Sequence, residues 1–295
     1  MNKGKGLIIL AAFFWGVSPI FYRTMFYRGF DGISVAAMRA YSASLIFIFY
    51  GLWKGLFFRI DLKDILFFGI YGILSIGGMS LFYSLAISKL PLAMVSMLLY
   101  TAPAFVIILS KAIYNDPITK LKVISLVFTF VGCALVVKVY SLTDFAVNLV
   151  GILLGLMSGI CYSGFTLFGK KGLKKYSPEI NTLLPTIFSC LLFLMLRPPS
   201  KLLLDSVEIV AVFWCIGIFG SVLPFFLYLK GLNMGVDGGQ ASIIAYIEPV
   251  TATMIGSLFF HENLELLQLL GIFIVILSTY FVLKDSSSQM DKVLV

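Results

Sequence analysis

Long runs of apolar residues, separated by charges, Pro and Gly, follow one another along nearly the whole chain. A helix needs about 17–25 predominantly apolar residues to cross a bilayer, because each residue adds about 1.5 Å of rise. By this rule the sequence predicts an all-α integral membrane fold with ten transmembrane helices. The expected spans are residues 6–26, 32–53, 64–87, 91–113, 120–138, 148–168, 178–196, 208–229, 237–259 and 265–284. Residues 285–295 are polar and are expected to form a cytoplasmic tail.

The composition supports a lipid environment for most of the chain. The 295 residues are 60% hydrophobic and 12% charged, with a mean hydropathy of +1.03. A soluble domain is about 45–50% apolar and about 25% charged, so no water-soluble fold of this length could bury so much apolar surface. The net charge of +8 comes from Lys and Arg residues between apolar runs, which is typical of membrane-protein loops. A nucleic-acid-binding surface is therefore not expected.

The 22 Lys and Arg residues are distributed unequally between alternate loops. With the N-terminus inside, the outside loops hold only Arg23, Arg28, Lys89, Lys138, Arg197 and Lys201. Arg39 lies within a span, and the other fifteen lie in inside segments, including the cluster from Lys170 to Lys175. Because cytoplasmic loops carry the excess of Lys and Arg, the sequence predicts that both termini are cytoplasmic in a multi-pass protein of the cell (inner or plasma) membrane.

The second half of the chain repeats the first at an offset of 146 residues, about half the length. Residues that coincide are Ser96 with Ser242, Tyr100 with Tyr246, Pro103 with Pro249, and Lys138 with Lys284. Five spans per repeat is an odd number, so residues 1–147 and 148–284 must form two inverted five-helix repeats. Inverted repeats are a transporter architecture, with the substrate site near the bilayer midplane between the halves.

Several short motifs occur in a characteristic order along these spans. They are Trp15-Gly16 in the first span, Arg39 early in the second, Tyr246-Ile247-Glu248-Pro249-Val250, Glu262 at the next helix boundary and Gly271 beyond it. This order resembles the EamA-type family of the drug/metabolite transporter superfamily. His261 departs from the family pattern, which usually has a small residue before the Glu. The resemblance implies export or exchange of amino acids, amines, nucleotides or related metabolites.

Two full charges lie deep inside predicted spans, Arg39 and Glu248. An ionisable side chain at the bilayer centre costs at least about 2.5–3.5 kcal/mol, so each should face a cavity or a partner. Glu248 is about 16 Å into its span and Arg39 about 10 Å into its own, at 1.5 Å per residue. Glu248 could bind the ammonium group of a substrate and Arg39 its carboxylate. Alternatively, the two form a structural ion pair, and the sequence leaves both interpretations open.

A Ser-x3-Tyr-x2-Pro pattern appears in both halves, and its spacing puts each trio on one helical face. A proline in mid-membrane frees a backbone carbonyl and permits a kink, so Pro103 and Pro249 are predicted helix kinks. Tyr100 and Tyr246 are then expected to line a cavity and contact the substrate. The remaining substrate-binding candidates are the aromatic residues Trp15, Tyr83 and Tyr162.

Together these features predict a secondary transporter that moves a small amino-acid-like or amine-like metabolite by alternating access, as an exporter or exchanger. A proton is the candidate coupling ion. The alternatives are nucleotide or sugar-phosphate substrates and, as another class, a passive channel. No G-x-x-x-x-G-K-[ST] motif occurs, which argues against direct drive by ATP. An enzyme is not expected, nor is a cofactor or metal, because the single histidine lies in a predicted loop and the four cysteines lack metal-ligand spacing.

Overall fold

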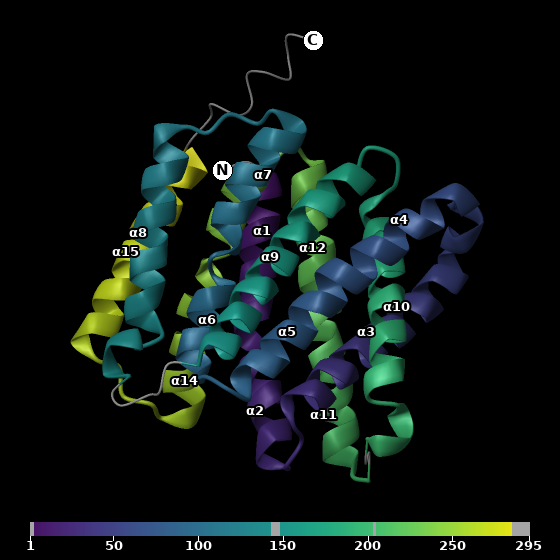
Figure 1. Ribbon diagram of the computed structural model, residues 1–295, viewed down its shortest axis with the longest axis horizontal. Helices are drawn as coiled ribbons and strands as arrows, with labels where there is room; N and C mark the ends of the chain where they lie inside the picture. Colours follow the sequence, from purple (N-terminus) through teal and green to yellow (C-terminus); the bar gives the residue numbers. More distant parts are fainter. Residues whose placement is uncertain (1–2, 143–147, 203–204, 285–295) are drawn as a thin grey trace.

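The computed structural model describes residues 3–142, 148–202 and 205–284, and in these residues the chain forms a bundle of helices (Figure 1). The first half contains α1 (Lys3–Val17), α2 (Pro19–Tyr27), α3 (Gly32–Lys54), α4 (Ile65–Ile70), α5 (Gly78–Ile87), α6 (Leu92–Leu99), α7 (Ala102–Tyr114) and α8 (Lys120–Val136). The second half contains α9 (Leu149–Gly172), α10 (Pro178–Leu196), α11 (Val207–Gly217), α12 (Leu223–Asn233), α13 (Gly238–Ile244), α14 (Ile247–Phe260) and α15 (Leu266–Lys284). The expected tail, residues 285–295, lies outside the described residues.

Several of these helices run on from one another and together are long and apolar enough to cross a membrane. Within the described part of the chain, nine such spans occur: Lys3–Tyr27, Gly32–Lys54, Leu62–Ile87, Leu92–Tyr114, Leu149–Gly172, Pro178–Leu196, Val207–Asn233, Gly238–Phe260 and Leu266–Lys284. The remaining expected span, residues 120–138, corresponds to α8, whose 17 residues are at the lower limit for crossing a bilayer. The protein is therefore a multi-pass membrane protein.

Two spans are interrupted at corresponding places in the two halves. Two residues separate the end of α6 from the start of α7, and Pro103 lies in the first turn of α7. α13 and α14 are separated in the same way, with Pro249 in the first turn of α14. Since proline has no N–H to donate, it is tolerated in the first turn of a helix, and each break leaves a helix N-terminus inside the bundle.

Two other spans contain a π-helical turn at matching positions. The turn at Tyr71–Gly77 joins α4 to α5, and the turn at Ile218–Val222 joins α11 to α12. Short π-helical segments inside α-helices frequently lie at functional sites. The helices that cross the centre of the bundle are thus mostly discontinuous.

The packing between the halves is reciprocal. α1 packs against α12 and α14 of the second half, and α9 packs against α5 and α7 of the first. α8 and α15 pair along one side of the bundle (Figure 1). A Cβ atom on Gly271 would lie 2.6 Å from the Gly132 carbonyl oxygen, so only glycine permits this close approach of α8 and α15.

α1 begins and α15 ends at the same end of the bundle (Figure 1). The Nζ atom of Lys5 donates hydrogen bonds to the carbonyl oxygens of Val282, at 3.1 Å, and Leu283, at 3.0 Å. We call this the N-terminal end and the other the opposite end. The turn between α9 and α10 lies at the N-terminal end, and the turn between α2 and α3 lies at the opposite end (Figure 1).

Candidate functional site

Glu248 lies in the first turn of α14, directly after the break that follows α13. Its backbone N–H donates to the Ala245 carbonyl oxygen at 2.9 Å, which fixes the turn. The side chain is only partly buried. Within the described residues its carboxylate has no hydrogen bond and no ion pair. A carboxylate at this depth without a partner is unusual, because its charge has lost much of its hydration.

Gly16 brings the first half of the chain against Glu248. A Cβ atom at Gly16 would lie 2.5 Å from the Thr251 Cβ atom and 2.6 Å from the Glu248 carbonyl oxygen. Real Cβ atoms do not approach this closely, so α1 can lie against α14 only because residue 16 is glycine. This contact places the neighbouring Trp15 at the centre of the bundle, where it is buried.

Arg39 lies on α3, facing α5. One of its Nη atoms donates to the Ser80 hydroxyl, and Ser80 in turn donates to the Ile76 carbonyl oxygen at 2.9 Å. Arg39 is close enough to attract the Glu248 carboxylate electrostatically, yet within the described residues no salt bridge of 4.0 Å or less joins them. The direct ion pair that the sequence left open is therefore not formed in this conformation, because Arg39 is held by Ser80.

Three phenol groups lie within electrostatic range of the Glu248 carboxylate, those of Tyr83, Tyr100 and Tyr162. The Tyr83 hydroxyl is hydrogen-bonded to the Ser96 hydroxyl at 3.1 Å. The rings of Tyr100 and Tyr246 meet with their centroids 5.7 Å apart, and the Tyr246 hydroxyl donates to the Tyr100 carbonyl oxygen. That carbonyl lies at the break between α6 and α7, so each interrupted span contributes a tyrosine to the same contact.

Trp15 connects this group to a cluster of aromatic rings. Its ring lies 6.1 Å from that of Tyr162 and 5.6 Å from that of Tyr228, measured between centroids. It also contacts Phe165 at 6.3 Å and Phe225 at 6.0 Å. Of the seven candidates, Trp15 contacts Tyr162 and Tyr100 contacts Tyr246. Glu248 interacts electrostatically with Arg39, Tyr83, Tyr100 and Tyr162.

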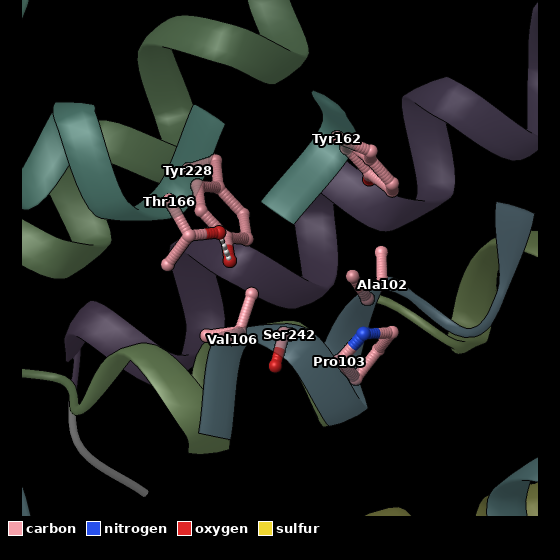
Figure 2. Close-up of a pocket in the computed structure, with 8 residues that line it drawn as sticks. Ala102, Pro103, Val106, Tyr162, Thr166, Tyr228 and Ser242 are labelled. Atoms are coloured by element: carbon pink, nitrogen blue, oxygen red, sulfur yellow. Dashed lines mark hydrogen bonds between the residues drawn. The ribbon is translucent and has the colours of Figure 1, made fainter. Parts of the chain in front are cut away.

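A small cavity of about 20 Å³ lies beside this region (Figure 2). It is lined by Ala102, Pro103, Val106, Tyr162, Thr166, Tyr228, Ser242 and Ala245. The Thr166 and Tyr228 hydroxyls are hydrogen-bonded to each other at 2.8 Å along one wall. The volume is enough for about one water molecule, so the halves are closed around the centre in this conformation.

A larger hollow of about 470 Å³ lies between the halves at the opposite end. Its wall includes Arg28, Asp31 and Ser34 from the first half and Arg197, Asp205 and Ile209 from the second. Its volume is in the range of small-molecule sites, roughly 300–1,000 Å³. The space between the halves is therefore much wider at this end than at the centre.

The sequence model of the EamA-like transporter family matches residues 2–138 and 149–284. The chain belongs to this family. The matched segments cover both halves, in agreement with the internal repeat, and the resemblance predicted from the motifs is confirmed.

Relatives of this EamA-like transporter extend over almost its whole length. An uncharacterized transporter of Archaeoglobus fulgidus is 29% identical over 279 residues, which cover 92% of this chain and 93% of the relative. Protein PecM of Dickeya dadantii is 24% identical, covering 97% of this chain and 93% of the relative. A crystal structure of another protein superposes with a TM-score of 0.80 at 16% identity, covering 96% of this chain and 99% of that chain, which shows a shared fold.

Three polar residues of the transporter's central region were missed by sequence reasoning: Ser80, Thr166 and Tyr228. Tyr228 lies one residue from the end of the expected span 208–229, whereas α12 continues to Asn233 and Tyr228 is buried within it. Ser80 and Thr166 are small hydroxyl residues, which are also common in the packing between membrane helices, so their presence in a span does not mark a site. Within the described residues no cluster of three or more His, Cys, Asp or Glu side chains could hold a metal ion.

Proposed function

We propose that this EamA-like transporter carries a small amino-acid-like or amine-like metabolite across the cell membrane by alternating access, as an exporter or exchanger. The observation that carries this proposal is the partly buried Glu248 carboxylate, which has no hydrogen bond or ion pair within the described residues. A charge at this depth needs a partner, and the ammonium group of a substrate would supply one. Arg39 lies close by and can bind the carboxylate of the same molecule.

The aromatic rings around Glu248 suit such a substrate. Phenol hydroxyls donate and accept hydrogen bonds, and ring faces attract ammonium groups. Tyr83 and Tyr162 are only partly buried, as are Arg39 and Glu248, so all four are accessible to a ligand that enters when the halves separate. A proton taken up by Glu248 when the substrate leaves would couple the two movements.

The proposed architecture is ten spans in two inverted halves. The contact of Lys5 with Val282 holds the start of α1 and the end of α15 at one end of the bundle. Nine crossings would leave these two points at opposite ends, so α8 supplies the tenth. Five crossings per half invert one half relative to the other, and the reciprocal packing of α1 on α12 and α9 on α5 fits this two-fold relation.

The N-terminal end is proposed to be cytoplasmic. The Lys-rich turn between α9 and α10 lies at this end (Figure 1), in accord with the excess of Lys and Arg in cytoplasmic loops. The opposite end, with its hollow between the halves, would then face outward.

Uptake into liposomes tests the proposed substrate site. Purified wild type, Glu248→Gln and Arg39→Gln are compared with labelled amino acids and polyamines, with thermal stability measured in parallel. Glu248→Gln keeps the size and hydrogen-bonding capacity but removes the charge. We expect each variant to lose uptake by about tenfold or more, the effect of about 1.4 kcal/mol, while its melting temperature stays close to that of the wild type.

The matched control is Glu265→Gln, which removes an exposed carboxylate paired with Lys138. It should leave uptake unchanged. Wild-type uptake by both Glu248→Gln and Arg39→Gln would refute the proposed site. A loss of uptake that follows a loss of stability would indicate a structural role instead. Saturable counterflow in the wild type separates a carrier from a channel.

A further inference from the structure

All eight salt bridges within the described residues join the first half of the chain to the second. In seven of them every side chain is at least 19% exposed. The exception is the pair of Lys122 and Asp237, with 2.8 Å between Nζ and Oδ1, whose side chains are 3% and 5% exposed. Exposed pairs contribute little because water and salt screen them, whereas a buried pair is costly to break on one side.

Lys122 is also bonded to the loop that precedes its helix, and Asp237 to the first turn of the helix that follows it. Lys122 lies in the first turn of α8, and its Nζ atom donates to the Pro117 carbonyl oxygen at 2.8 Å. Asp237 precedes α13, and its Oδ1 atom accepts from the Gln240 backbone N–H at 3.0 Å, which caps the helix. The pair therefore ties the start of α8 in one half to the start of α13 in the other.

The pair lies beside the central cavity, toward the N-terminal end, where α8 begins (Figure 1). Gly238 follows Asp237, and a Cβ atom on it would lie 3.2 Å from the Cγ2 atom of Thr166, which lines the cavity. The Asp237 charge also reaches the phenol of Tyr228 on the same wall. The contact between α8 and α13 therefore lies on the N-terminal side of the central cavity.

The internal repeat shows that this pair has no counterpart. The offset of 146 residues places Lys122 on Gln268 and Asp237 on Pro91. Gln268 is neutral and donates to the Val136 carbonyl oxygen at 3.0 Å, and Pro91 has no polar side chain. At the position where two-fold symmetry would place a second buried ion pair, the chain therefore has none.

We infer that Lys122 and Asp237 are the gate residues at the N-terminal end of the transport path, and that their pairing holds this end closed in the resting state. The inference rests on the proposed alternating access between the halves. Since the matching contact at the opposite end is missing, the two closed ends differ in stability. The hollow of about 470 Å³ at the opposite end agrees with a resting state that opens on that side.

Cysteine accessibility tests the gate without a substrate. The native Cys133, Cys161, Cys190 and Cys215 are replaced by Ala, and Ser242→Cys places a thiol on the cavity wall. The test variant is Lys122→Gln with Asp237→Asn, which removes both charges together and leaves an Asn that can still cap α13. We expect an impermeant methanethiosulfonate reagent, applied from the N-terminal end in oriented vesicles, to label this variant about tenfold faster than its parent.

The matched control is Lys138→Gln with Glu265→Gln. It removes an exposed pair that also joins the two halves and also involves the segment of α8, but at the opposite end. Its labelling rate from the N-terminal end should equal that of the parent. Equal rates in the test variant and the parent, with both proteins folded by melting temperature, would overturn the inference.

A second measurement applies if the double variant does not fold. Lys122→Cys and Asp237→Cys are joined by a short bis-methanethiosulfonate reagent, which forms a disulfide with each thiol. The cross-link should block uptake, and reductant, which cleaves these disulfides, should restore it. Continued uptake by the cross-linked protein would also overturn the gate. The gate and the substrate site can fail separately. Faster labelling of the Lys122→Gln, Asp237→Asn variant together with normal uptake by Glu248→Gln would reject only the substrate site. Unchanged labelling together with a loss of uptake in Glu248→Gln would reject only the gate.

Discussion

The N-terminal end and the opposite end of the bundle are held together by different contacts between the same two halves. At the N-terminal end the cations are lysines, and the Lys122–Asp237 pair is almost completely buried. At the opposite end most are arginines, on the surface and around a hollow: Arg23 with Glu262, Arg28 with Glu208, and Arg197 with Asp31. Burial, not the number of ion pairs, therefore distinguishes the two ends.

This difference shows how a repeated fold can have unequal ends. The repeat reproduces helix lengths, helix breaks and π-helical turns, because these depend on the backbone and on Pro and Gly at matching positions. A charge pair depends on two side chains only. Two substitutions, at Lys122 and Asp237 or at their counterparts Gln268 and Pro91, are therefore enough to give one end a buried ion pair that the other lacks.

The largest effect is expected when the buried pair loses one partner. Lys122→Met leaves the Asp237 charge buried without its ion-pair partner, which should lower the free energy of unfolding by about 3–5 kcal/mol. Denaturation in mixed micelles measures this. Adding Asp237→Asn should recover most of the loss. A loss below about 1 kcal/mol, as for an exposed pair, would remove the contrast between the two ends.

A smaller, pH-dependent effect is expected at Asp31, at the opposite end. Partial burial raises the pKa of its carboxyl, but the hydrogen bonds from the Ser34 backbone N–H and hydroxyl and from Arg197 outweigh this and lower the pKa. The ionised form is thus favoured by folding. Its contribution to stability is present above the unfolded pKa of about 3.9 and is lost as the pH falls through the lower folded pKa.

Melting temperatures of the wild type and Asp31→Asn between pH 7 and pH 2 check this prediction. The difference in melting temperature between the two proteins should be largest at neutral pH and should shrink below about pH 4. Asn retains the capping bond to the Ser34 backbone N–H, so helix capping cancels in the comparison. A difference that does not change with pH would show that the Asp31 charge is unimportant.

The smallest effect is expected from Arg28→Gln, which breaks an exposed pair with Glu208 at the opposite end. Because both side chains are about half exposed, the loss of stability should be about 0–1 kcal/mol. Denaturation in mixed micelles measures this loss of stability, in parallel with that of Lys122→Met. A loss as large as that of Lys122→Met would mean that the two ends are held equally firmly.

Much of the fold was predictable from the hydrophobic pattern. The expected span 178–196 coincides with α10 (Pro178–Leu196), and the expected span 265–284 begins one residue before α15. Pro103 and Pro249 marked the spans that are interrupted. The π-helical turns were not predicted, because no single residue type marks them, and neither was the break at Ser18 between α1 and α2.

The candidate site was predictable where a charge or a large ring lies inside a span. Arg39, Glu248 and the tyrosines are candidates of this kind, and in the structure Glu248 interacts electrostatically with Arg39, Tyr83, Tyr100 and Tyr162. Lys122 was assigned to an inside segment, because a lysine near the start of a span resembles a loop charge. Only the fold shows that it is buried against Asp237, since the two residues are far apart in the sequence and belong to different halves.

The lack of a side chain at Gly16 affects how α1 and α14 can move relative to each other. Glu248 is covalently part of the second half, yet its carbonyl oxygen is where a Cβ atom on α1 would collide, so the first half bears directly on it. In the proposed alternating access, α1 and α14 must slide past each other at this contact or move together. Sliding by one residue would change the height of the carboxylate relative to Trp15 by about 1.5 Å, half the length of a hydrogen bond. In the proposed mechanism, the position of the Glu248 charge along the membrane normal would therefore depend on the relative movement of the two halves.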